Sequence, residues 1–369
     1  MKKCMGFNCG IVGLPNVGKS TIFNALTAQH VPAESYPFCT TDHNTGVVSV
    51  PDVRLDDIAK IFKPDRVVNT HIEFVDIAGL VAGAHKGEGL GNKFLGNIRN
   101  VDAIAHVVRC FENPDIPHQY ESVDPVRDVG VVETEMMLAD LEIINKQLDR
   151  ILKSAKSGDK RIKHQLEQMG ILKQTLEEGR LLKNCAGIIH ELKIEGVEIA
   201  TITDKPVFFI ANIGESELND GGPALKALEA FCNKRSDQLL KISAEIEEEI
   251  ADLPAGERAA YRKELGIEHS SLEEIIRAGY SLLNLVTFFT KESSEVKAWT
   301  VESGTKAPQA AGKIHTDFEK GFVKAIVYNY SELMKFNDEH VLKEKGLLRI
   351  EGHDYIVRDG DIIQFRFAN

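Results

Sequence analysis

The chain has 369 residues, of which 43% are hydrophobic and 27% charged, and its formal net charge is −12. This length allows two or three domains with a substantial core, while the acidic balance argues against nucleic-acid binding through bulk charge and leaves room only for a local basic patch. The 6 cysteines show no CxxC spacing, so we expect reduced thiols, a cytoplasmic location and no zinc site. No apolar run approaches the ~20 residues of a membrane span, so no membrane partner is expected.

A glycine-rich stretch lies near the amino end, between an apolar run at 9–12 and a helical pattern at 21–26. It reads Gly-Leu-Pro-Asn-Val-Gly-Lys-Ser and matches the phosphate-binding loop G-x-x-x-x-G-K-[ST] in its strand–loop–helix context. Backbone N–H groups of such a loop and of the following helix point at one anion. Lys19 would neutralise the β- and γ-phosphates, and Ser20 would be a Mg²⁺ ligand. We therefore predict nucleotide binding by Asn16, Val17, Gly18, Lys19, Ser20 and Thr21.

Residues 7–130 alternate strand-like and helix-like patterns, which predicts an α/β fold with a mainly parallel sheet. One strand ends at Asp76, where a carboxylate suits a second contact to the Mg²⁺ shell, and the N–H of Gly79 would meet the γ-phosphate. Thr40, with Thr41 as its competing neighbour, would add a hydroxyl ligand to Mg²⁺ from a loop ordered by the triphosphate. The glycine-rich segment 83–93 indicates a switch, or alternatively a merely flexible loop.

These motifs resemble the Obg-related branch of the translation-factor P-loop GTPases, and most of all the YchF family of Obg-like ATPases. The resemblance rests on 13–20, Tyr-Pro-Phe-Cys-Thr at 36–40, Asp-Ile-Ala-Gly-Leu at 76–80 and Lys-Gly-Glu-Gly-Leu-Gly-Asn-Lys-Phe-Leu at 86–95, and it extends from Gly6 to the C-terminus. It implies an enzyme that hydrolyses ATP and binds the ribosome, with the large subunit as the expected site.

Residues 131–195 change character, with apolar residues at heptad spacing from Leu138 to Leu152 and a second helical pattern at 162–176. Ser-Gly-Asp at 157–159 breaks the pattern between them. We predict an antiparallel helical hairpin inserted into the nucleotide-binding domain, in agreement with the resemblance. Its charged faces are either solvated or a partner-binding arm.

A buried strand at 206–212 ends in Asn212-Ile213-Gly214-Glu215, where ordinary relatives carry Asn-Lys-x-Asp. The aspartate of that motif accepts hydrogen bonds from the N1–H and 2-amino groups of guanine. Adenine instead offers an acceptor and a donor, which suits the side-chain amide of Asn212 better than a carboxylate. The resemblance to YchF proteins, which share this departure, implies ATP in preference to GTP, and a GTPase of ordinary specificity is the alternative.

Two further site predictions come from the resemblance. Ser243 and Ala244 match the loop that closes over the base through main-chain groups. His118, in the loop after Cys-Phe-Glu-Asn at 110–113, matches the YchF histidine that orients the attacking water, because Leu80 after D-x-x-G cannot hydrogen-bond. An exposed loop histidine is the alternative for His118, and His85 is a second candidate. Asn16 accompanies potassium-assisted hydrolysis in some relatives, so K⁺ is a further cofactor hypothesis.

From Leu282 onward, strand-like runs at 283–289, 296–300, 322–328, 355–357 and 362–367 alternate with helical pieces near 310–315 and 331–336. This predicts a small mixed sheet folded over a helix, a ubiquitin-like β-grasp, and the resemblance names it a TGS domain. Lys313, His315 and Lys320 are candidate RNA contacts, or belong to a solvated loop. The predicted domains are 5–130 with 196–282 for the nucleotide, 131–195 for the helical insertion and 283–369 for the TGS domain. A ribosome- or RNA-binding module in which hydrolysis is incidental is the competing function.

Overall fold

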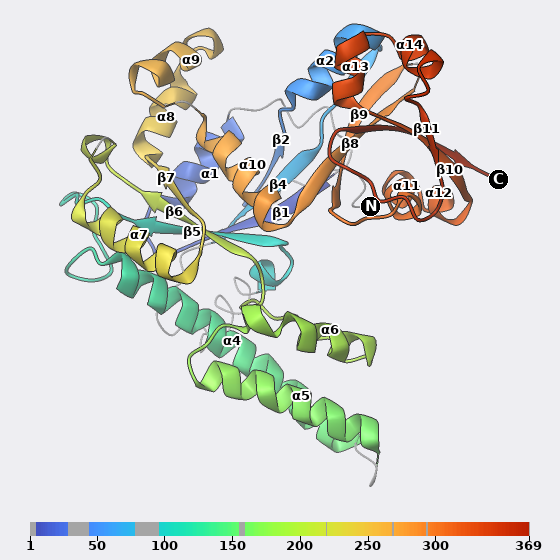
Figure 1. Cartoon of the computed structure of the whole chain (residues 1–369). Coiled ribbons are helices and arrows are strands. Elements are labelled where there is room, and N and C mark those ends of the chain that lie inside the picture. Colours follow the sequence, from blue (N-terminus) through green and yellow to red (C-terminus); the bar gives the residue numbers. More distant parts are fainter. Residues whose placement is uncertain are drawn as a thin grey trace.

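The computed structural model describes residues 5–28, 44–77, 96–154, 159–218, 220–267, 269–292 and 294–368. Thr40, Thr41, Gly79, Leu80 and His85 therefore lie outside the described residues. Two sheets and a long helical arm make up the described chain (Figure 1). Among the described residues, no helix combines the length and apolar character that crossing a membrane requires.

The first sheet is mainly parallel, as predicted, and the α/β fold class is confirmed. Its order is β2 (Thr45–Ser49), β4 (His71–Asp76), β1 (Met5–Val12), β5 (Ala103–Arg109), β6 (Val207–Asn212) and β7 (Leu239–Ile242), with β2 alone antiparallel to its neighbour. Every residue of β5 is buried, because helices cover both faces of a parallel sheet. The helices α1 (Lys19–Ala28), α7 (Pro223–Arg235) and α10 (Ser271–Leu282) pack on this sheet, whereas α8 (Ala244–Asp252) packs mainly on α1 and α9 (Ala255–Glu264) packs on α8.

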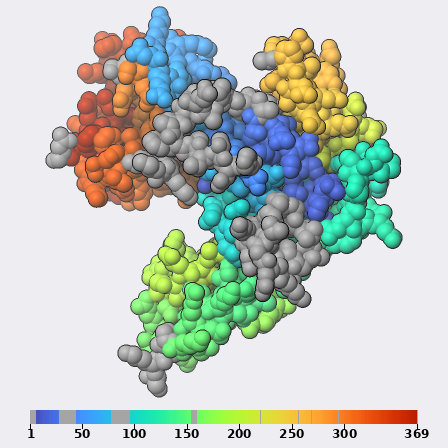
Figure 2. All heavy atoms as spheres, turned by 180° about the vertical axis from the view of Figure 1, so that it is seen from behind, coloured from blue at the N-terminus to red at the C-terminus, as the bar shows by residue number. Residues whose placement is uncertain are grey.

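The arm consists of α4 (Pro125–Ser154) and α5 (Lys160–Glu177), followed by η3 (Leu182–Cys185) and α6 (Ala186–Ile194). The first half of α4 packs on the sheet through Val132 and Met136, and its second half packs on α5 through a separate small core around Ile144 and Leu172. α4 therefore belongs both to the nucleotide-binding domain and to the arm. It begins at Pro125, six residues before the predicted start of the insertion at 131. The arm projects away from the rest of the molecule (Figures 1 and 2).

The second sheet belongs to the C-terminal part. Its chain-order elements are β8 (Leu285–Lys291), β9 (Glu295–Glu302), α11 (Ala307–Ile314), α12 (Thr316–Lys320), β10 (Phe322–Asn329), α13 (Tyr330–Phe336), α14 (Glu339–Glu344), β11 (Arg349–Glu351) and β12 (Asp361–Phe367). The order in the sheet is β11-β10-β12-β8-β9-β3, with β12 parallel to β8 and α11 packed on one face. The predicted strand at 355–357 is wrong: Val357 N–H donates to Thr305 O, outside any strand, so only a single bridge forms, between Lys306 and Ile356.

The sixth strand of this second sheet comes from the amino-terminal part of the sequence. β3 (Arg66–Val68) pairs in parallel with β9, and α2 (Val53–Phe62) buries Leu55 and Ile58 against Phe289 and Leu333. Residues 53–68 lie between β2 and β4 and fall inside the predicted nucleotide domain 5–130. In space they complete the C-terminal unit instead, so the two sheets are joined by a shared segment as well as by the chain that links α10 to β8.

Candidate functional site

The glycine-rich loop connects β1 to α1 in a conformation that needs its glycines. Gly18 has φ +96°, and a Cβ at this position would lie 2.2 Å from Nδ2 of Asn212. A Cβ at Gly13 would lie 2.4 Å from the carbonyl oxygen of Val107. Side chains at these two positions would push the loop away from the sheet, so both glycines let the backbone approach closely and direct its N–H groups inward.

Lys19 is held inside this loop. Its side chain is 6% exposed, and Nζ donates to the carbonyl oxygen of Leu14 at 2.6 Å. Burial lowers the pKa of Lys19 to about 8, and the nearby carboxylate of Asp76 opposes that shift. The ammonium is therefore a cation with few water contacts, which an anionic phosphate would stabilise strongly.

Ser20 and Asp76 meet across the strand ends. Ser20 Oγ donates to Asp76 Oδ2 at 2.8 Å, while Asp76 Oδ1 is buried and has no hydrogen-bond partner among the described residues. A hydroxyl and a carboxylate with an unsatisfied oxygen are the donor set that suits Mg²⁺, which prefers oxygen ligands and keeps several waters. Within the described ranges no group of three or more His, Cys, Asp or Glu side chains could hold a metal. The residues fit Mg²⁺ completed by phosphate and water oxygens.

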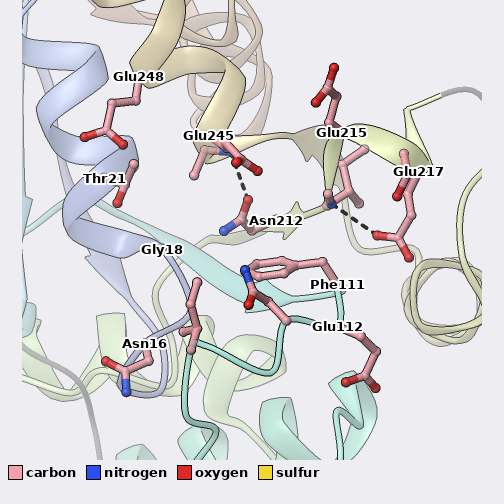
Figure 3. Close-up of a pocket in the computed structure, with 16 residues that line it drawn as sticks. Asn16, Gly18, Thr21, Phe111, Glu112, Asn212, Glu215, Glu217, Glu245 and Glu248 are labelled. Carbon is pink, nitrogen blue, oxygen red and sulfur yellow. Dashed lines mark hydrogen bonds between the residues drawn. The ribbon is translucent and has the colours of Figure 1, made fainter.

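A cavity of about 720 Å³ opens beside the loop. Four segments converge on it: the loop and start of α1, the loop after β5, the loop after β6 and the start of α8 (Figure 3). The predicted residues that line it are Asn16, Gly18, Thr21, Asn212, Ile213, Glu215 and Ala244. Its volume lies in the range of small-molecule and cofactor sites, and its place at the carboxyl ends of parallel strands is where α/β sheets bind ligands.

Asn212 braces two of these segments together. Its Nδ2 donates to the carbonyl oxygen of Val17, and its Oδ1 accepts the N–H of Ala244, each at 2.9 Å. Figure 3 shows the second of these bonds, and the two together fix the plane of the amide. The second hydrogen of Nδ2 and the second lone pair of Oδ1 remain for a ligand. The residue lines the cavity, and its selection of adenine stays a prediction.

The neighbouring base-motif residues differ in exposure. Ile213 is 4% exposed and packs in the core around Phe209 and Leu225, whereas Glu215 is exposed at the start of η4 (Glu215–Glu217) on the cavity wall. Ser243 is buried just before α8, and its Oγ has no partner among the described residues. Of this group, Glu215 has the side chain best placed to meet a ligand.

Phe111 lines the cavity and was not singled out from the sequence. It lies in the loop after β5, on the wall of the cavity (Figure 3). The buried Arg109 guanidinium lies 4.5 Å from its ring centroid. An aromatic ring beside a nucleotide-sized cavity suits stacking on a base. The only sequence signal for it was an aromatic residue directly after a buried strand, which is too common to be diagnostic.

His118 does not line the cavity. Its Nδ1 accepts the N–H of Tyr120 at 3.1 Å, and its Nε2 lies 3.0 Å from Asp128 Oδ2. Nδ1 also lies 3.3 Å from the carbonyl oxygen of Tyr120. Both ring nitrogens are thereby engaged, so the predicted role in orienting water stays a prediction.

Comparisons with known proteins agree with this architecture. A family model described as "50S ribosome-binding GTPase" matches residues 8–139, and the model YchF-GTPase_C, described as "Protein of unknown function (DUF933)", matches residues 285–368. A protein of Haemophilus influenzae named "Ribosome-binding ATPase YchF" is 50% identical, covering 98% of this chain and 99% of the relative. The protein of the same name from Escherichia coli O157:H7 is 48% identical with the same coverage.

A solved structure shows the same relationship. The "Structure of the Schizosaccharomyces pombe YchF GTPase" superposes with a TM-score of 0.84 at 34% identity, covering 98% of both chains. Full-length matches at this identity cover both sheets and the arm, not the phosphate-binding loop alone. This chain belongs to the YchF family.

Proposed function

We propose that this chain is a Mg²⁺-dependent ATPase that hydrolyses ATP to ADP and phosphate and binds the ribosome in a nucleotide-dependent manner. The observation that carries the enzymatic part is the buried Lys19 beside the Ser20–Asp76 pair, with a nucleotide-sized cavity adjoining them. The names of the bacterial relatives, "Ribosome-binding ATPase YchF", support both the ATPase activity and the ribosome binding in this proposal. A cytoplasmic location follows from this function.

The residues divide the work of phosphoryl transfer. Lys19 and the loop N–H groups hold the β- and γ-phosphates, and Ser20 and Asp76 hold Mg²⁺, together with Thr40. Mg²⁺ supplies charge neutralisation on the phosphate oxygens when bound. The N–H of Gly79 binds the γ-phosphate, so that neighbouring segments sense its presence. Hydrolysis then depends on alignment of water with the terminal phosphate.

Asn16 and His118 complete the proposed site. Asn16 is exposed with φ +61°, and its Nδ2 donates to the carbonyl oxygen of Pro117 at 3.1 Å, which leaves Oδ1 as an oxygen ligand for K⁺. His118 orients the attacking water once one of its ring nitrogens is freed. Replacement of K⁺ by Na⁺ should lower the hydrolysis rate, and an unchanged rate would remove K⁺ from the mechanism.

The test of the enzymatic proposal is ATP and GTP hydrolysis by the wild type and Asp76→Asn, which keeps the shape of the side chain but removes the carboxylate charge. We expect ATP to be the better substrate, and kcat to fall at least about 100-fold in the variant because the metal loses its charged ligand. Equal hydrolysis by the two proteins would contradict the metal assignment. Preferred hydrolysis of GTP would establish the alternative, an ordinary GTPase.

Ribosome binding is proposed to use RNA contacts of the arm and the TGS domain on the large subunit. Five cations are exposed on the described ends of α4 and α5 near the arm tip, in a protein of net charge −12: Arg150, Lys153, Lys160, Arg161 and Lys163. The carboxylates beside them are Asp149, Asp159 and the partly buried Glu195. Such a local excess suits phosphate contacts. In the TGS domain, Lys313 and Lys320 flank His315, which is about half exposed. Residues 53–68 belong with 283–369 to the TGS unit, residues 131–195 form the helical insertion, and the rest of 5–130 together with 196–282 forms the nucleotide domain.

Co-sedimentation with separated ribosomal subunits tests this surface. The triple variant Lys153→Gln, Lys160→Gln and Lys163→Gln should bind the large subunit more weakly, and the slope of log affinity against log salt should fall by about one per lost phosphate contact. The matched control replaces Lys146 and Lys173, which pair with Glu142 and Glu177 on the same arm. Equal losses in both variants would contradict a tip-specific contact.

A further inference from the structure

The loop that joins β5 to α4, residues 110–124, is fastened to the nucleotide domain at its start. The guanidinium of Arg109 is 1% exposed and donates to three loop carbonyls at 3.0–3.1 Å, those of Phe111, Asn113 and Ile116. Asn16 of the glycine-rich loop donates to the next carbonyl along, that of Pro117. The chain leading into His118 is therefore fixed on the side that faces the nucleotide site.

The far end of the loop is fastened by Asp128, in the first turn of α4. Its side chain is 3% exposed, and Oδ2 accepts from Nε2 of His118 at 3.0 Å. Its other oxygen accepts from Nε and Nη2 of Arg127 at 3.0 and 2.8 Å, and that guanidinium lies 4.3 Å from the ring centroid of Tyr120. The imidazole is thus held by a buried, charge-balanced cluster, in which charged hydrogen bonds are stronger than neutral ones.

We propose that Asp128 is a positioning residue that restrains His118, and that hydrolysis requires His118 to exchange Asp128 for the attacking water. This inference rests on the proposed role of His118. Nδ1 lies 3.1 Å from the Tyr120 nitrogen and Nε2 lies 3.0 Å from Asp128 Oδ2, so both ring nitrogens already have partners in the protein. The restraint keeps basal hydrolysis slow by keeping the free-ring state a minor population.

The position of Asp128 connects the restraint on His118 to the helical arm. α4 is one continuous helix from Pro125 to Ser154. Its first turn carries Asp128, which contacts His118, and its second half forms part of the arm. Asp140, midway along it, is fully buried and accepts hydrogen bonds from the backbone N–H groups of Ile202 and Thr203, which ties the helix to the entry of β6. The arm and the turn carrying Asp128 therefore belong to one continuous helix, which is anchored on the first sheet between them.

Basal ATP hydrolysis without ribosomes tests the restraint. Asp128→Asn keeps the side-chain shape but loses the charge, and we expect kcat to rise about tenfold, as expected when a charge-assisted hydrogen bond is weakened, with KM for ATP nearly unchanged. Asp128→Glu keeps the charge and should restore slow hydrolysis. The matched control is Asp124→Asn, which removes an exposed carboxylate that bonds the Arg127 N–H at the start of α4 without contacting His118. Adding His118→Ala to Asp128→Asn should abolish the rise.

A second readout follows the imidazole directly. Carbethoxylation by diethyl pyrocarbonate, measured by mass spectrometry, should be slow at His118 in the wild type relative to the exposed His190, and fast at His118 in Asp128→Asn. Hydrolysis and carbethoxylation that are both unchanged in a folded Asp128→Asn protein, while His118→Ala is impaired, would overturn the restraint and leave the proposed function standing. Full activity of His118→Ala would overturn the role of His118 and the restraint together.

Discussion

The variant Asn212→Ala tests whether the side-chain amide of Asn212 mainly holds two loops of the nucleotide site together or mainly selects the base. In the wild type the amide joins Val17 of the phosphate-binding loop to Ala244 of the closing loop by two buried hydrogen bonds of 2.9 Å. Alanine at position 212 leaves the buried carbonyl of Val17 and the buried N–H of Ala244 without these hydrogen bonds. An unsatisfied buried group costs about 1–3 kcal/mol, so we expect a total cost of about 2–3 kcal/mol once part of it is relieved by water.

We expect this cost to appear in nucleotide affinity, because the two loops enclose the ligand together. At 1.4 kcal/mol per factor of ten, the dissociation constants for Mg·ATP and Mg·GTP should both rise about 30- to 150-fold, and their ratio should stay the same. We expect the ratio to be conserved because the two hydrogen bonds that the variant loses join parts of the protein to each other and not to the base.

Competition titration of a fluorescent nucleotide by ATP and GTP measures both constants in one assay. Asn113→Ala is the matched control: Asn113 also lines the cavity, but its side-chain oxygen bonds only the exposed N–H of Asp115, so a change below about threefold is expected. A large loss for ATP alone would refute the brace and restore Asn212 as the residue that selects adenine.

Three further predictions concern folding. Burial lowers the pKa of His106 to about 3, so the folded state favours the neutral ring. The resulting stabilisation is complete above about pH 6.5, the pKa of the unfolded state, and is lost as the pH falls. Between pH 7 and 5 the free energy of unfolding measured in urea should therefore fall by about 2 kcal/mol more for the wild type than for His106→Phe, and equal losses would contradict this. Leu55→Ala should destabilise the C-terminal sheet by about 2–5 kcal/mol, seen as faster hydrogen exchange in β10 and β12, whereas Val53→Ala, at a site 73% exposed, should have no effect. Ile213→Lys should lower the melting temperature by several degrees, because it places an ammonium at a 4% exposed site; a stable variant would show that the side chain turns into the cavity.

The contacts that the sequence predicted well are local ones. Gly13 to Ser20 lie between a strand and a helix, as expected. The glycines, the lysine and the hydroxyl of this loop are close together in the sequence, so their arrangement depends on local conformation. The pairing of Ser20 with Asp76 was also expected, since adjacent parallel strands end at the same edge of the sheet. The His118–Asp128 contact was not, because an aspartate in a helix's first turn usually signals only a favourable helix dipole.

The amino-acid pattern by itself determined the phosphate-binding loop, the parallel sheet and the two-helix arm, because each depends on periodicity or on residues close together in the chain. Tertiary structure alone decided that β3 and α2 complete the C-terminal sheet, since Leu55 and Ile58 would look the same in a helix packed on either sheet. It also decided what Asn212 does. Its amide joins the phosphate-binding loop to the start of α8, because the backbone groups of Val17 and Ala244 surround it.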